Sequence, residues 1–343
     1  NAMTPRTFTI LGIVAVISVT AATLALGMRS QFLEFRADGE RVFPSLLENA
    51  DQVASFQVRQ GNDQMTFVHG DKGWVLSESG GYAIDNRLAA KVILGLASLE
   101  FLEAKTKRKE KLAKLRLEDP LSEKSQARLL TFVDKNDKEI AHLILGRDNY
   151  SLPATMTGGI YIRRPNEDQA WLAKGTVEIG GEPRDWLVRN IIDIPLEQIK
   201  HVRFSHPDGE TFTIVGDLSV KDGFKLESVP EGMKLKTSYG PRSIANVVNN
   251  FLLNDVRRQT ELTLTDTEAS VSEFTLVNGD VVKLELWDKK PRNWMRVIVS
   301  GESQQAAAIA KRTEGWVYDI PDYQAELLRK RFTELIEAEK PAS

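Results

Sequence analysis

The stretch that decides the fold is TLVNGDVVKLEL, residues 275–286, which places Asn278-Gly279 between two apolar arms. An Asn-Gly pair in this position is a strong signal for a β-hairpin, because both residues tolerate the positive φ angles of a tight turn. Residues 131–133 and 140–145 flank a polar turn in the same way. Strands joined as hairpins predict antiparallel sheets, whereas parallel strands would alternate with helices.

The pattern around this hairpin occurs twice, with a period of roughly 145 residues. Each copy contains an alternating strand, a glycine turn that leads into a strand beginning with a large aromatic residue, an amphipathic helix and two hairpins. The paired segments are 51–58 with 197–204, 71–76 with 221–226, 87–103 with 243–257, and 159–172 with 294–318. A further helix is expected after each copy, at 184–190 and at 322–337.

These segments predict an α+β fold, in which an N-terminal transmembrane helix precedes two tandem copies of an antiparallel-sheet-plus-helix unit. We expect Trp74 to correspond to Phe224, and Trp171 to Trp316. The expected divisions are a short tail with a tag scar at 1–7, a transmembrane anchor at 8–27, a juxtamembrane tether at 28–48, the first repeat at 49–195, the second repeat at 196–338 and a tail at 339–343.

The anchor is predicted from an uncharged, mostly apolar run at residues 8–27, between Arg6 and Arg29. About 20 such residues are enough to cross a bilayer, whereas the apolar part of a signal peptide is usually about 7–15 residues long. A cleaved signal is the alternative, because Val19 and Ala21 are small enough to precede a cleavage site. The short tail before the anchor favours export of the rest of the chain. We therefore expect a single-pass protein of the bacterial inner membrane with its body in the periplasm.

Composition argues against several classes of function. The 343 residues carry a formal net charge of -3, with 45 basic and 48 acidic side chains and no cysteine. The near balance of charge argues against nucleic-acid binding, and the lack of cysteine excludes disulfides, thiolate nucleophiles and zinc-thiolate sites.

The remaining polar residues predict no catalytic, cofactor-binding or metal-binding site. The histidines are His69, His142, His201 and His206. None has another histidine at the three- or four-residue spacing of a helical metal site. Because Ser205, His206 and Asp208 share one short turn, they are not expected to form a catalytic relay.

One cluster of positive charge lies between residues 105 and 116, interrupted by the single carboxylate of Glu110. Its cations are Lys105, Lys107, Arg108, Lys109, Lys111, Lys114 and Arg116. A solvated linker would explain such a run. In a chain tethered to a membrane, each cation close to anionic lipid also adds about 1 kcal/mol of attraction. The cluster is therefore also a candidate docking surface.

Five short motifs lie before, within and at the end of the first copy. They are FPSL at 43–46, KLRLEDP at 114–120, LGR at 145–147, GIYIR at 159–163 and DWL at 185–187. Together they resemble a bacterial family catalogued as domain of unknown function 4340, whose members are membrane-anchored auxiliary proteins that occur with gliding-motility-type ABC transporters. The resemblance implies an auxiliary role and brings no catalytic residues with it. The second copy departs from the motifs, since Leu286-Trp287 stands where the first has Leu145-Gly146.

The sequence therefore predicts a non-enzymatic, membrane-tethered periplasmic accessory or scaffold subunit of an ABC-type transport assembly. The expected partners are the transporter permease or a related auxiliary subunit, and the lipid bilayer through residues 8–27. The alternative is a solute- or lipid-binding module with an apolar cleft between the two repeats. An enzyme would need convergent titratable groups, which the sequence does not assemble.

Overall fold

The structure consists of two compact units. The computed structural model describes residues 39–150, 158–217, 223–238 and 240–339. One unit combines the chain up to Lys72 with Asn86–Ile179, and the other combines Gly73–Asp85 with the chain from Gly180 onward. The division thus differs from the single boundary expected between residues 195 and 196, because one short segment of the first half packs with the second.

The predicted anchor at 8–27 lies outside the described residues, as does the tail expected at 1–7. Within the described part of the chain, no helix is both long enough and apolar enough to cross a membrane. The membrane topology therefore stays a prediction from the sequence.

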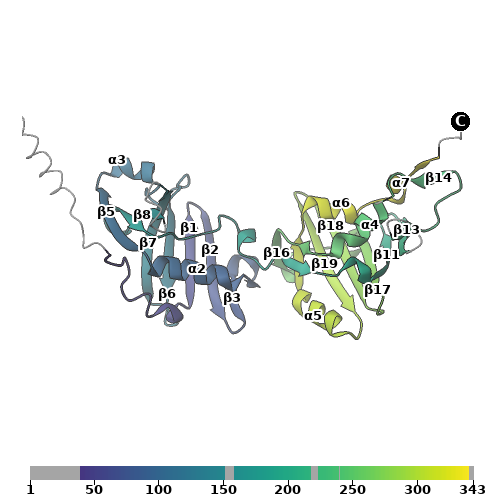
Figure 1. Cartoon of the computed structure of the whole chain (residues 1–343), viewed down its shortest axis with the longest axis horizontal. Helices are drawn as coiled ribbons and strands as arrows, with labels where there is room; N and C mark the ends of the chain where they lie inside the picture. Colours follow the sequence, from purple (N-terminus) through teal and green to yellow (C-terminus); the bar gives the residue numbers. More distant parts are fainter. Residues whose placement is uncertain (1–38, 151–157, 218–222, 239, 340–343) are drawn as a thin grey trace, which may run out of the picture. The chain divides into compact units, whose positions relative to one another are not determined.

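The first unit is built on an antiparallel sheet, drawn in purple to teal in Figure 1. Seven neighbouring strands of a nine-stranded sheet belong to this unit, hydrogen-bonded in the order β2-β1-β6-β7-β8-β9-β5. Their bounds are β1 Ser55–Gln60, β2 Asp63–Gly70, β5 Glu100–Thr106, β6 Arg128–Val133, β7 Glu139–Asn149, β8 Gly159–Arg163 and β9 Ala170–Lys174. Phe56 of β1 stacks on Phe67 with ring centroids 4.5 Å apart, and Phe132 approaches it edge-on at 5.6 Å. Neighbouring strands therefore share one aromatic core face.

Helix α2 (Asn86–Ala97) buries one apolar face and lies across the strands of this unit in Figure 1. The prediction of a helix over 87–103 is right for its start and wrong for its end, because residues from Glu100 onward form β5. Phe101 is buried in that strand and packs edge-on against Trp171, with ring centroids 5.0 Å apart. Pairing with β9 thus outweighs the helical spacing of the apolar residues.

Residues 39–48, the described part of the expected tether, are folded onto the first unit. The backbone N–H of Phe101 donates to the carbonyl of Glu40 at 2.9 Å, and the N–H of Val42 donates to Leu99 at 2.8 Å. Val42 and Leu46 are buried. The chain therefore joins the folded body beside the start of β5.

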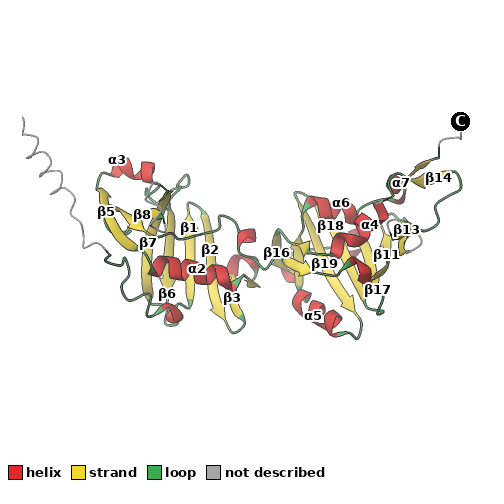
Figure 2. Cartoon of the chain, in the orientation of Figure 1, coloured by secondary structure: helices red, strands yellow, loops and turns green. Residues whose placement is uncertain are grey.

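The second unit is also built on an antiparallel sheet, whose strands are yellow in Figure 2. The order of its main sheet is β13-β12-β11-β17-β18-β19-β20-β16. The bounds are β11 Ile199–Ser205, β12 Thr211–Gly216, β13 Phe224–Leu226, β16 Asp255–Arg258, β17 Ser270–Leu276, β18 Val281–Lys289, β19 Arg292–Ser300 and β20 Trp316–Asp319. The hairpin predicted from residues 275–286 is confirmed as β17 and β18, and Gly279 takes the positive φ of +91° in their turn.

The two helices that the sequence predicts over 243–257 and 322–337 are shorter in the structure, and α5 was not predicted. The helices described in the second unit are α4 Gly240–Ala245, α5 Gln304–Thr313, α6 Asp322–Leu328 and α7 Phe332–Leu335. The helix expected over 243–257 ends early, because Asn250 adopts φ +53° and the following residues form β15 (Phe251–Leu252) and β16. Local left-handed backbone and strand pairing end the helical pattern there.

Two further predicted helices are also corrected. Residues 184–190 contain only a 3-10 turn, Pro183–Asp185, followed by β10 (Asn190–Ile192), which pairs with β15. The helix expected over 322–337 is divided into α6 and α7, and its last residues form β21 (Ile336–Ala338), which pairs with β14 (Met233–Leu235). In both places, pairing with a distant segment decides the conformation. The fold class is confirmed at the level of α+β with mostly antiparallel strands.

The inserted segment Gly73–Asp85 belongs to the core of the second unit. It contains β3 (Gly73–Leu76) and β4 (Tyr82–Ala83). The ring of Tyr82 packs edge-on against Trp316 at 5.0 Å and against Tyr318 at 6.1 Å between centroids. The guanidinium of Arg258 lies 3.7 Å from the centroid of Trp316. A residue of the first half of the chain thus completes an aromatic cluster of the second.

Truncation of this aromatic residue should destabilise the second unit selectively. Tyr82→Ala should lower the free energy of unfolding by about 3–5 kcal/mol, the usual cost of removing a buried aromatic ring. Hydrogen exchange should become faster in β16 and β20 and stay unchanged in β1 and β6. Tyr323→Ala is the matched control, because Tyr323 is 58% exposed. Faster exchange in β1 and β6 alone would contradict the assignment of the segment to the second unit.

Candidate docking surface

The predicted cluster of cations forms a folded element at one edge of the first unit. It begins on β5, continues through α3 (Lys109–Leu112) and a 3-10 turn (Ala113–Leu115), and ends at Arg116. All seven cations are exposed: Lys105, Lys107, Arg108, Lys109, Lys111, Lys114 and Arg116. We call residues 105–116 the basic cap. It is a folded element rather than an extended linker.

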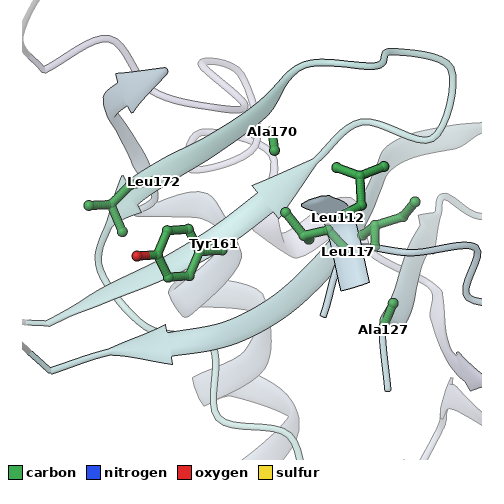
Figure 3. Close-up of a cluster of buried hydrophobic side chains, with 7 residues drawn as sticks. Leu112, Leu117, Ala127, Tyr161, Ala170 and Leu172 are labelled. Carbon is green, nitrogen blue, oxygen red and sulfur yellow. The ribbon is translucent and has the colours of Figure 1, made fainter. Parts of the chain in front are cut away.

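Buried leucines hold the basic cap on the sheet. Leu112 and Leu117 are buried in a cluster of apolar side chains shown in Figure 3, and Leu115 packs against it. The other members of the cluster are Ala127, Ile144, Tyr161, Ala170 and Leu172. Because the leucines face inward, the cations between them, Lys114 and Arg116, face water, which is the pattern of an amphipathic element.

A glycine lets the cap approach the sheet closely. A Cβ atom added to Gly146 of β7 would lie 2.2 Å from the carbonyl oxygen of Leu115 and 3.0 Å from the side chain of Leu117. No real Cβ contact is that short, so a larger residue would have to push the cap away. Position 146 therefore requires glycine because there is no space for a side chain. The backbone conformation does not require it, since the φ angle of Gly146 is not positive.

The basic cap carries little compensating negative charge. The ammonium group of Lys105 lies 2.6 Å from the carboxylate of Glu103. Among the described residues, the other six cations of the cap form no ion pair with a carboxylate. Unpaired exposed cations at this density create a positive surface potential that attracts anionic partners.

Comparison with known proteins supports the resemblance noted in the sequence. The family described as "Domain of unknown function (DUF4340)" matches residues 74–268, more than half of the chain, including the basic cap. The chain belongs to the DUF4340 family. Searches of curated proteins and of solved structures found no match.

Three of the motifs that carry the DUF4340 resemblance meet at the cap. Residues 114–120 form its end, Gly146 provides the space beneath it, and residues 159–163 form the neighbouring strand β8. The guanidinium Nε of Arg163 donates to the carbonyl of Leu117 at 3.0 Å. These motifs therefore build the cap and its support.

His142 and His206 contact groups of the folded protein that stabilise their positions. His142 of β7 is half-buried, and its Nδ1 lies 3.4 Å from the Glu139 carboxylate. His206 is buried, with Nε2 3.0 Å from the carbonyl of Lys330. The Asp208 carboxylate accepts from Arg331 at 2.8 Å. Asp208 is thus engaged by Arg331, which directly precedes α7, in keeping with the hairpin turn expected at 205–208.

A buried polar network in the second unit was missed by sequence reasoning. Asp255 and Asp319 face each other on β16 and β20, and both are buried. Arg292 lies 2.7 Å from the Asp255 carboxylate and 3.4 Å from that of Asp319. Its members come from three separate strands, so no local motif could have revealed it.

Filling the space at Gly146 should loosen the cap. Gly146→Ala should lower the free energy of unfolding by about 1–3 kcal/mol, the usual cost of overpacking. Thermal and urea denaturation measure this loss. Gly181→Ala is the control, because nothing lies within 4 Å of a Cβ at that position. Equal stability of the two variants would show that the cap does not press on β7.

The buried network predicts a pH dependence of stability. Burial raises the pKa of Asp319, against the opposing effects of the Asn293 N–H and the Arg292 charge. The carboxyl of Asp319 therefore binds its proton more tightly in the folded state than in the unfolded state. The contribution of this group to stability is fully present below the usual Asp pKa near 4, and it is lost as the pH rises through the raised pKa of the folded state.

Asp319→Asn removes this titration. In urea unfolding from about pH 4 to pH 7, the stability of the parent protein relative to the variant should fall as pH rises. A relative stability that instead rises with pH would contradict the direction of the shift.

Proposed function

We propose that this DUF4340 protein is a non-enzymatic, membrane-tethered accessory subunit of an ABC-type transport assembly, with its body in the periplasm of a bacterium. The predicted anchor at 8–27 supplies the tether. The observation that carries the proposal is the position of the basic cap. The cap begins on β5, and the chain joins the folded body beside the start of the same strand.

The distances along the chain support this arrangement. Glu40 and Val42 hydrogen-bond to the backbone at Phe101 and Leu99, at the start of β5. At about 3.3 Å per residue, Lys105 lies about 15 Å further along that strand. Residues 28–38 could span about 40 Å if extended. The cap is thus within reach of the surface in which the proposed anchor is held.

We further propose that the two units are copies of one fold. Strand order β2-β1-β6-β7-β8-β9-β5 has a counterpart in β12-β11-β17-β18-β19-β20-β16. The cross-strand pair Glu100 and Lys174 occupies the same place in the order as Asp255 and Asp319. Trp171 and Trp316 each lie three residues before the last member of those pairs, which supports the correspondence expected from the sequence.

Neutralising the basic cap should weaken binding to anionic surfaces without unfolding the protein. In a chain beginning at Gly39, Gln at positions Lys107, Arg108, Lys109 and Lys111 should reduce salt-sensitive binding to vesicles that contain phosphatidylglycerol. Stability should change by less than about 0.5 kcal/mol per site, because the four side chains are exposed. A charge-matched control replaces Lys124, Lys135, Lys138 and Lys200, which are exposed elsewhere.

The same cap variant in the full chain tests the accessory role. Gentle detergent extraction of the parent should recover membrane subunits of an ABC-type transporter, and the cap variant should recover less of them than the control variant does. Recovery of no transporter subunit with the parent contradicts the transport proposal. Unchanged vesicle binding and unchanged recovery with the cap variant contradict docking through the cap.

A further inference from the structure

A polar cavity of about 430 Å³, partly open to solvent, lies at the end of the basic cap. Three arginines, Arg116, Arg128 and Arg147, line it together with Gln60, Gln126, Gly146 and Asp148. Its volume is within the range of small-ligand sites, but its lining lacks the apolar side chains that usually dominate them. The residues therefore suit a small, strongly polar ligand.

The backbone directs the three arginines to this one place. Arg116 follows the last turn of the cap with φ +56°, a left-handed conformation that is uncommon for residues other than glycine. Arg128 is the first residue of β6. Arg147 lies where the pairing of β7 with β8 shifts register between Leu145 and Asp148. Such an irregularity changes the direction of a side chain relative to the sheet.

The guanidinium groups have few protein partners. Arg128 is half-buried, and its Nη1 donates to the carbonyl of Ile179 at 3.0 Å. The guanidinium of Arg147 lies 5.4 Å from the ring centroid of Tyr161. Within the described ranges, neither of them nor Arg116 forms an ion pair.

The electrostatics of the cavity favour an anion. Burial lowers the pKa of Arg128; Asp148 raises it, and the nearby charge of Arg116 lowers it further. The two arginines are thus close enough to repel each other. Asp148 compensates one of the three positive charges, so the lining has a formal excess of two. An anion between the arginines would relieve this repulsion.

We propose that this cavity binds a phosphate-bearing anion, with Arg116, Arg128 and Arg147 as donors to the phosphate oxygens. A phosphate monoester at neutral pH carries up to two negative charges, which match the excess of the lining. The planar fork of an arginine also matches phosphate oxygens geometrically. The phosphate group belongs either to a lipid headgroup or to a free small molecule. The site requires neither the transporter partner nor docking of the cap.

Calorimetry on the full chain in a non-ionic detergent tests the site with defined probes. Inorganic phosphate is titrated first, followed by dihexanoyl phosphatidic acid and, as the zwitterionic comparison, dihexanoyl phosphatidylcholine. We expect saturable binding of one phosphate group per chain. Arg147→Gln should weaken it at least about tenfold, because the variant loses a charge-assisted contact. Arg147→Lys should restore part of the affinity, since charge is kept and the fork is lost.

Lys109→Gln is the matched control, because it removes one exposed cation of the cap that does not line the cavity. Its effect should stay below about twofold at physiological salt, where exposed charges are screened within about 8 Å. Thermal denaturation confirms that the Arg147 variants are folded, as expected for an exposed side chain.

The outcomes separate the sources of the phosphate group. Binding of both inorganic phosphate and phosphatidic acid supports a site for the phosphate group itself. Binding of phosphatidic acid alone supports a lipid headgroup, and binding of inorganic phosphate alone supports a free small molecule. Equal binding of phosphatidylcholine, or no binding of any probe, overturns the proposal. An equal loss of affinity with Arg147→Gln and Lys109→Gln also overturns it, since diffuse charge would then explain the binding. None of these outcomes depends on recovery of a transporter.

Discussion

The first unit depends on a close approach between two segments of backbone, the carbonyl of Leu115 and the chain at Gly146. This contact brings Leu112 and Leu117 down onto the sheet, where they are buried. The cations between them, Lys114 and Arg116, are then held in water. A cluster of like charges would normally repel itself into an extended conformation. Here, apolar burial beneath the cap outweighs that repulsion, and a fixed positive surface results.

Much of the architecture was predictable because its signals are local. The Asn278-Gly279 turn and its alternating arms identify a hairpin within twelve residues, and the structure contains it as β17 and β18. The α+β class could be inferred from such hairpins. The start of α2 was also readable, since its buried positions recur at helical spacing.

The errors occur where distant pairing decides the conformation. Residues 100–103 have helical spacing, yet they form β5 because β9 lies beside them. Residues 336–338 become a strand through pairing with β14. The same holds for the candidate site. The positive charge of residues 105–116 was evident from the sequence. The convergence of Arg116, Arg128 and Arg147 depends on a turn and a register shift, which have no local signature in the sequence.

The sharing of Gly73–Asp85 with the second unit has a consequence for synthesis of the protein. Tyr82 precedes its partner Tyr318 by 236 positions. At about 5–20 residues per second, a ribosome needs about 10–50 s to traverse that interval. During this time the aromatic ring has no native partner from the last strands, so the second core closes only near the end of translation. In the nascent chain, Tyr82 therefore lacks its contacts with Trp316 and Tyr318 for most of the synthesis of the protein.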